Sequence, residues 1–211
     1  MNAGFSNLAA LKASLLAAEL RALTDFDTML SNIGLGTSGM IEQHCNRKFI
    51  RAAGDTEVIP ADRSTFVLSR YPIETITKVE AREDYQSAWQ DLGLDAIRTV
   101  RESAGLVIMD SNADVGASFQ DVRFTFTGGY FWETLDVGDA GYPSTQPSGS
   151  AALPDVVRLA WILQCKQIWD SQDRLGTGIA AKPGDRSKLG DLELLPAVKT
   201  MLQPFVRMSI V

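Results

Sequence analysis

Three glycines between Gly34 and Gly39 match the spacing G-x-G-x-x-G, in which glycines let a backbone approach a pyrophosphate at a helix N-terminus. A nucleotide-binding enzyme needs this loop to follow a β-strand within a βαβ unit. Here the glycines follow a helical pattern, and no βαβ unit surrounds them. We therefore expect a flexible joint between helices, and we keep a nucleotide-binding enzyme as an alternative hypothesis.

The histidine and the cysteines do not form a convergent set in the sequence. His44 is the only histidine, and its neighbour Cys45 points about 100° away around a predicted helix, which suits neither a metal site nor a nucleophile with its base. Cys45 and Cys165 both stand in apolar helical patterns, where a free thiol behaves as a small buried hydrophobic group. A reducing compartment is the simpler interpretation of two such cysteines.

Acidic side chains offer the remaining chemistry. Asp110, Asn112 and Asp114 have the spacing of calcium ligands, but Val115 occupies the position where a calcium loop needs glycine. We expect a polar β-turn there, because Asp and Asn favour turns. Carboxylate pairs elsewhere in the chain are typical of a solvated surface. The sequence therefore predicts no catalytic residue, no metal site, no cofactor and no enzyme activity.

The balance of charge argues against a dedicated DNA-binding protein. The 211 residues include 20 Lys+Arg against 26 Asp+Glu, which gives a net charge of −6, so counterion release contributes little to binding nucleic acid. Arg47, Lys48 and Arg51 follow a predicted helix, where cations complement the helix dipole. No apolar run approaches the roughly 18–20 residues of a membrane span, and no signal-peptide pattern opens the chain. We expect neither membrane insertion nor export by such a signal.

Helical patterns occupy both ends of the chain. Leucines form a wide apolar face within residues 8–23, and a second pattern follows in residues 26–45. The longest predicted helix, residues 154–174, opens with Pro-Asp and is apolar on two sides. Because such a helix lies between other elements, we expect it to pack against the leading helices and against a short helix that begins at Pro196.

The middle of the chain has a residue pattern typical of β-strands. Short apolar runs separated by turn residues predict strands at residues 56–59, 65–69, 73–80, 96–101, 106–109 and 122–127. In the last of these, Val122, Phe124 and Phe126 point to one face while the intervening polar side chains point to the other. We therefore expect a sheet with one buried face.

A long connection of Gly, Ser, Pro and Asp residues follows this last strand. It exceeds the roughly 12–15 residues at which loops become uncommon, so it is expected to be functional or mobile. It also carries aromatic side chains that an isolated soluble loop does not ordinarily expose. We predict that they form a subunit or tail interface. They are Tyr130, Phe131, Trp132 and Tyr142.

These elements predict an α+β fold in which a discontinuous helical bundle, built from the N- and C-terminal segments, carries an inserted antiparallel β-rich domain. The expected segments are the N-terminal helices in 1–52, the β-rich insertion in 53–130, the long loop in 131–152, and the C-terminal helices and tail in 153–211.

The order of several short motifs resembles a known family. The leading helices end in Cys-Asn-Arg-Lys-Phe (residues 45–49), and Tyr-Pro-Ile (71–73) and a Gly-Leu-Val-Ile strand from Gly105 follow. Next come Val-Arg-Phe-Thr-Phe-Thr-Gly-Gly-Tyr (122–130) and a helix opened by Leu-Pro-Asp (153–155). Together these landmarks resemble the head-to-tail connector proteins of tailed bacteriophages, also called adaptor or head-completion proteins.

The resemblance implies a structural protein of the virion neck, made in the host cytoplasm. Such proteins form a homo-oligomeric ring, commonly of twelve copies, that docks under the portal protein and offers a platform to the tail or to a stopper or tail-terminator protein. DNA passes non-specifically through the channel. A tail-terminator or tail-completion protein is the alternative within the same virion context.

The same resemblance implies a role for the C-terminal tail, because the last segment of a connector often reaches into the portal. On that basis we expect portal contacts from Phe205, Val206, Arg207, Met208, Ile210 and Val211. Packing of this tail against the protein's own helices stays open as the alternative.

Overall fold

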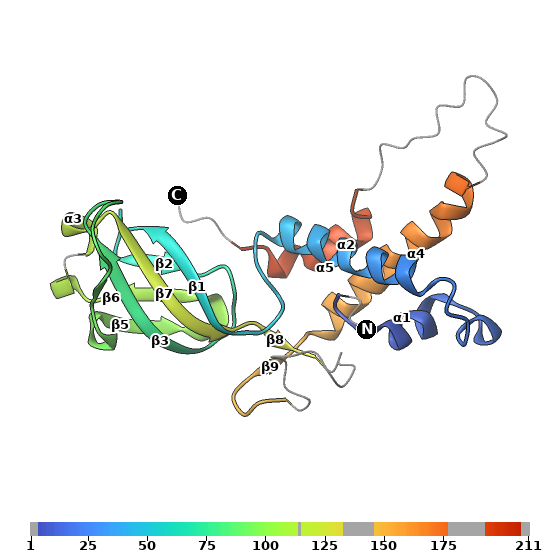
Figure 1. Cartoon of the computed structure of the whole chain (residues 1–211), viewed down its shortest axis with the longest axis horizontal. Helices are drawn as coiled ribbons and strands as arrows, with labels where there is room; N and C mark the ends of the chain where they lie inside the picture. The colour runs from blue at the N-terminus through green and yellow to red at the C-terminus, as the bar shows by residue number, and fades with distance from the viewer. Residues whose placement is uncertain (1–3, 114, 133–145, 177–192, 208–211) are drawn as a thin grey trace, which may run out of the picture. The chain divides into compact units, whose positions relative to one another are not determined.

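The computed structural model describes residues 4–113, 115–132, 146–176 and 193–207 (Figure 1). They form two compact units. The helical unit comprises the described residues of Met1–Cys45, Trp132–Gln146 and Leu153–Val206, and the β unit those of Asn46–Phe131, Pro147–Ala152 and Arg207–Val211. The fold is α+β as predicted, since helices from both ends of the chain form one bundle and an antiparallel β-rich segment is inserted between them.

The helical unit is built from four α-helices and two 3-10 turns among its described residues. They are α1 (Leu8–Leu15), η1 (Ala18–Leu20), α2 (Asp27–Cys45), α4 (Asp155–Gly176), α5 (Pro196–Leu202) and η5 (Gln203–Phe205). α1 begins where the side chain of Asn7 accepts a hydrogen bond from the amide of Ala10 at 2.7 Å, the usual N-cap arrangement. α2 ends before Asn46, whose left-handed φ of 49° stops the helix.

α4 is the central helix of this unit, because it contacts α1, α2 and α5. Its inward side buries Val157, Ala160, Trp161 and Cys165 completely. The indole Nε1 of Trp161 donates a hydrogen bond of 2.9 Å to the backbone carbonyl of Gly34 on α2. The predicted packing of this helix between the leading helices and the terminal helix is confirmed.

The second apolar side of α4, however, is left partly exposed by the helices that the structure describes. Val156, Leu159 and Leu163, which we call the outer α4 stripe, are 37%, 49% and 36% exposed. Our expectation that both apolar sides lie between other elements of the chain is wrong for this one. A hydrophobic pattern marks a face that avoids water, but it does not tell which surface covers that face.

The predicted joint between helices at Gly34–Gly39 is also wrong. Asp27–Cys45 is one helix, so the backbone amides of this segment belong to the helical hydrogen-bond pattern. No loop is present there to surround a phosphate, and the structural basis of the nucleotide-binding alternative is absent. Helix packing overrides the weak helix propensity of glycine in this case.

The β unit contains two antiparallel sheets. One has the order β1 (Ala52–Pro60), β7 (Asp121–Gly128), β3 (Ile73–Arg82) and β4 (Gln90–Asp91), and the other has the order β2 (Thr65–Val67), β6 (Leu106–Met109) and β5 (Ile97–Arg101). A short parallel pair joins β8 (Tyr130–Phe131) to β9 (Ala151–Ala152). The connections include η2 (Leu94–Ala96), η3 (Glu102–Ala104), η4 (Ser111–Ala113) and α3 (Val115–Ser118).

The core of the β unit lies between the two sheets. Phe124 and Phe126 of β7 are fully buried, as the predicted alternation requires, and Phe124 packs on Phe66 of β2 with ring centroids 5.3 Å apart. Val79 of β3 and Val107 of β6 complete the same cluster. Along the part of the chain that is described, no helix is long and apolar enough to span a membrane.

Replacing Trp161 by Phe should lower the free energy of unfolding by about 1–3 kcal/mol, because the carbonyl of Gly34 loses a buried donor. Urea denaturation measures the change. As a control, Gln167→Ala on the exposed side of the same helix should stay within about 0.5 kcal/mol of the wild type. Equal stability of the Trp161→Phe protein and the wild type would contradict the assigned role of this hydrogen bond.

Candidate functional site

The sequence landmarks of the β unit meet in one place, which we call the arginine cluster (Arg47, Phe49, Tyr71 and Tyr130). The guanidinium carbon of Arg47 lies 3.3 Å from the ring centroid of Tyr71, 4.7 Å from that of Phe49 and 5.4 Å from that of Tyr130. Arg47 is only 4% exposed and also donates to the backbone carbonyl of Tyr71. Aromatic faces attract a desolvated cation, so this cluster fixes the start of the β unit.

Glycines let the backbone segments around this cluster approach each other. A Cβ on Gly105 would lie 2.8 Å from the ring of Tyr71, and one on Gly129, which has a φ of +95°, would lie 2.7 Å from the carbonyl oxygen of Ile50. Both positions therefore require glycine. The amide of Tyr130 then donates to the carbonyl of Phe49 at 2.7 Å.

The arginine cluster is not a catalytic arrangement. Burial raises the pKa of the Tyr71 phenol above its ordinary value, and the positive charge of Arg47 offsets this only in part. Tyr71 is therefore neutral at physiological pH and serves as a packing surface for the cation. The expectation that Arg47 complements a helix dipole is replaced by a different contact, since its charge lies against aromatic rings.

The predicted aromatic interface is placed differently by the structure. Phe131 and Trp132 are each only 3% exposed, and Trp132 packs edge-on against Phe5 with centroids 5.5 Å apart. The premise that these two side chains need a neighbouring subunit to cover them is wrong. Tyr130 is half-buried and stacks on Phe49, whereas Tyr142 lies outside the described residues.

The predicted portal-binding tail is described only in part. Phe205 and Val206 are half-buried in the helical unit. Arg207 belongs to the β unit, where its guanidinium donates to the carbonyl of Val67 and lies 3.9 Å from a carboxylate oxygen of Glu57. Met208, Ile210 and Val211 lie outside the described residues.

The basic side chains of the β unit are largely engaged by carboxylates. Arg51 forms two hydrogen bonds with Glu74, at 2.7 and 2.8 Å, so the cations 47, 48 and 51 do not form a phosphate site. Other described pairs are Arg70 with Asp55, Arg82 with Asp121, and Arg123 with Glu80. Lys78 and Arg123 hold the pKa of Glu80 below its ordinary value.

The structure does not arrange His44 and the two cysteines as a reactive or metal-binding group. Cys45 and Cys165 are both fully buried, and neither forms a disulfide. Burial raises the pKa of Cys165 to about 12, and the neighbouring hydroxyl of Thr37 on α2 offsets this rise only in part. Within the described ranges, no three His, Cys, Asp or Glu side chains gather in a way that could hold a metal ion.

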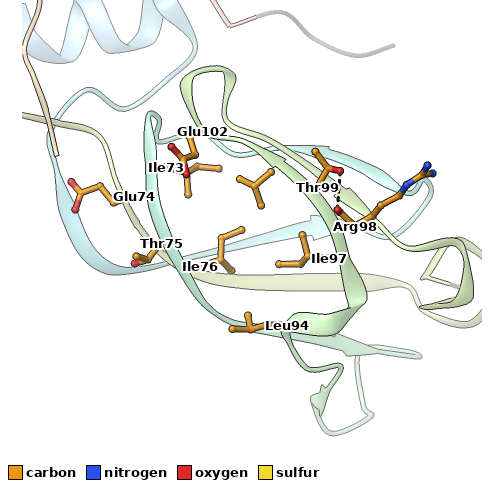
Figure 2. A pocket seen from close by; sticks show the side chains of 10 residues that line it. Ile73, Glu74, Thr75, Ile76, Leu94, Ile97, Arg98, Thr99 and Glu102 are labelled. Atoms are coloured by element: carbon orange, nitrogen blue, oxygen red, sulfur yellow. Dashed lines mark hydrogen bonds between the residues drawn. The ribbon is translucent and has the colours of Figure 1, made fainter. Parts of the chain in front are cut away.

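A hollow of about 360 Å³ opens between β3 and β5, where the two sheets do not join (Figure 2). Figure 2 shows apolar side chains, Ile76 and Ile97 among them, between the two strands. The charged groups at the hollow are Glu74, Arg98 and Glu102, and Glu74 is already paired with Arg51. The hollow therefore offers an apolar seam between two strands and no convergent catalytic groups.

Exposed apolar surface concentrates in the helical unit, which sequence reasoning missed. Besides the outer α4 stripe, this unit has an exposed leucine on α2. It is Leu35, which is 47% exposed and lies in the glycine-containing segment 34–39. Gly36 follows it directly and Gly39 lies one helical turn further on, and a Cβ at either position would meet nothing within 4 Å. We call Leu35, Gly36 and Gly39 the outer α2 face. The signal in the sequence was glycine inside a helical pattern, which we assigned to a joint.

Arg47→Lys should lower the free energy of unfolding by about 2 kcal/mol, because an ammonium group cannot stack flat against several rings. Thermal denaturation measures the loss. Arg63→Lys is the matched control, since Arg63 is an exposed arginine paired with Asp62 at 2.8 Å, and it should change stability by less than about 0.5 kcal/mol. Equal losses in both variants would contradict the role of the arginine cluster.

The native protein should react with a thiol reagent such as Ellman's reagent at least about a hundredfold more slowly than the urea-unfolded chain, because both thiols are buried and Cys165 stays protonated. The release of the coloured thiolate at pH 8 measures both rates. Rapid labelling of either cysteine in the native protein would contradict the burial assigned to it.

Comparisons with known proteins identify the fold. No protein-family model and no curated protein matches the sequence. Chains from the neck of an empty gene transfer agent (GTA) particle, computed with C6 symmetry, and from the virion of the native particle each match with a TM-score of 0.59 and 16% identity. A chain from the native neck computed with C12 symmetry matches with a TM-score of 0.52 and 13% identity. Each match covers 97% of this chain and 90% of the other, so the chain shares the fold of components of phage-like particle necks.

Proposed function

We propose that this protein is a structural subunit of the neck of a phage-like particle, where copies form a ring under the portal and join head to tail. The observation that carries the proposal is a fold shared with neck components over 97% of the chain. A match over almost the whole chain includes both the helical unit and the β insertion. It therefore supports a common architecture and not merely one common supersecondary motif.

The symmetry of the matching particles supports a ring of identical subunits. Their necks were computed with C6 and C12 symmetry, and twelve copies satisfy both. We propose a ring of twelve copies of this chain. A closed ring of one chain requires two different surfaces on each copy, because each subunit meets its neighbours through unlike patches.

The charge of the protein suits the passage of DNA. A net charge of −6 and the pairing of Arg51, Arg82 and Arg123 with carboxylates leave little free positive charge in the described β unit. DNA held by many cation–phosphate contacts would move slowly, because each contact releases counterions and adds affinity. A channel with few such contacts lets DNA slide, and we propose that role for the ring.

The C-terminal tail, Phe205–Val211, remains our proposed portal contact. Within this tail, Arg207 contacts Val67 and Glu57 of the β unit. The residues beyond it, Met208, Ser209, Ile210 and Val211, are mainly apolar and suit a hydrophobic groove on a partner. Of the predicted aromatic interface, only Tyr130 combines a described position with partial exposure, so we keep it as a minor contact.

The protein should co-migrate in size-exclusion chromatography with the portal protein of the same particle, and the mixture should show rings by electron microscopy. Purified portal protein and purified tail proteins are the probes. The absence of both co-migration and rings would contradict a neck protein. Binding to tail components without binding to the portal would instead establish the alternative, a tail-terminator or tail-completion protein.

Removal of residues 208–211 should weaken portal binding at least about a hundredfold, since burial of even one or two apolar side chains contributes about 3 kcal/mol. The melting temperature should not change, because Arg207 keeps its contacts with Val67 and Glu57. Replacement of Ser209 alone by Ala is the control and should leave binding intact. Portal binding that is unchanged by the truncation would refute the role of the tail.

A further inference from the structure

The helical unit presents apolar side chains on the two outer sides of one helix pair. α2 and α4 lie against each other (Figure 1). Thr37 and Trp161 are fully buried on their facing sides. Leu159 and Leu163 stand two residues on either side of Trp161, about 200° around α4. Leu35 stands two residues before Thr37 and is therefore also on the far side of its helix.

The outer α4 stripe and the outer α2 face consequently point in opposite directions from the α2–α4 pair. Seven of the ten large hydrophobic side chains that are exposed in the described structure belong to the helical unit, namely Leu20, Leu23, Met29, Leu35, Val156, Leu159 and Leu163. Three of these form the outer α4 stripe at helical spacing, which gives a continuous ridge along one side of α4. Such a ridge is typical of a helix that packs against another helix.

The outer α2 face is a shallow surface whose shape is complementary to the ridge of the outer α4 stripe. Gly36 and Gly39 lie beside Leu35, and neither glycine is required by a contact within the chain, since a Cβ at either position would meet nothing within 4 Å. An exposed glycine inside a helix costs about 1 kcal/mol relative to alanine. By contrast, a Cβ on Gly4 would collide with the carbonyl of Gly34, so close packing within the chain explains that glycine.

We infer that, in the proposed ring, the outer α4 stripe of one copy packs against the outer α2 face of the next copy. This inference rests on the proposed function, because a ring supplies the second copy. The apolar ridge at Val156, Leu159 and Leu163 enters the shallow surface left by Gly36 and Gly39, where the absence of side chains lets the two helices approach closely.

The opposed directions of the two surfaces explain why this contact propagates and closes. A surface that pairs with itself gives a dimer, whereas two unlike surfaces on opposite sides of a subunit give a chain that closes when the rotation per copy fits the ring. The contact also covers the apolar stripe that the single chain leaves in water.

Leu159→Asp should raise the protein concentration needed for half-maximal ring assembly by about tenfold or more, because the contact would bury an unpaired charge. Mass photometry and electron microscopy with the portal protein measure the rings. Leu94→Asp is the matched control, since Leu94 is also 49% exposed but lies in the β unit. It should assemble as the wild type does.

The Gly39→Ala variant distinguishes an effect on the contact between copies from an effect on the stability of the subunit. Alanine should raise the melting temperature of the monomer, because it favours the helix and meets nothing in the chain. The same methyl group should weaken ring assembly, because it stands where the neighbouring helix approaches. A variant that is more stable yet assembles less well cannot be explained by misfolding.

A cysteine at each surface tests the pairing directly. Cys45 and Cys165 are fully buried, so they do not interfere with cross-linking. Under mild oxidation of assembled rings, the double variant Leu35→Cys/Leu159→Cys should give a ladder of covalent oligomers, and each single variant should give monomers.

The outcomes distinguish this contact from the ring itself. Rings in the wild type, with loss in Leu159→Asp and a ladder in the double-cysteine variant, support the inference. If the Leu159→Asp variant still forms rings and the double-cysteine variant gives no ladder, the contact is overturned but the proposed function stands. If the wild type forms no ring with the portal protein, both the proposed function and this contact are overturned.

Discussion

The close approach of backbone at Gly129 and Ile50 is the constraint on which the rest of the β unit depends. The chain first enters this unit at Asn46 and first leaves it after Phe131, and the backbone hydrogen bonds next to these two points hold them close together. The amide of Tyr130 donates to Phe49 and the amide of Arg51 donates to Tyr130, which ties entry to exit. A side chain at position 129 would separate the two segments.

Arg47 completes this junction. Its buried guanidinium joins aromatic rings from three separate stretches of the chain, represented by Phe49, Tyr71 and Tyr130. An arginine suits this position better than a lysine, because its flat, weakly hydrated cation can stack against rings and still donate to a carbonyl. Three of the motifs noted in the sequence, at residues 45–49, 71–73 and 122–130, thus meet at this junction in the structure.

In the helical unit, one apolar side of α4 packs inside the unit and another is exposed. Trp161, Thr37 and Cys165 hold α2 and α4 together, with the indole hydrogen-bonded to Gly34. The outer side of the same α4 is apolar and partly exposed among the described residues. In the ring that we propose, the inner side of this helix stabilises the subunit and the outer side contacts the next copy.

The sequence by itself determined the class of fold, the identity of most elements and the alternation in β7, because periods of 2 and 3.6 residues report which side chains avoid water. Only the tertiary structure decided which surface covers each apolar face. It showed that Phe131 and Trp132 are covered within the chain, that the outer α4 stripe is not, and that Gly34 to Gly39 continue a helix. The physical reason is that burial depends on contacts between segments far apart in sequence, such as α2 with α4, and local periodicity carries no information about those partners.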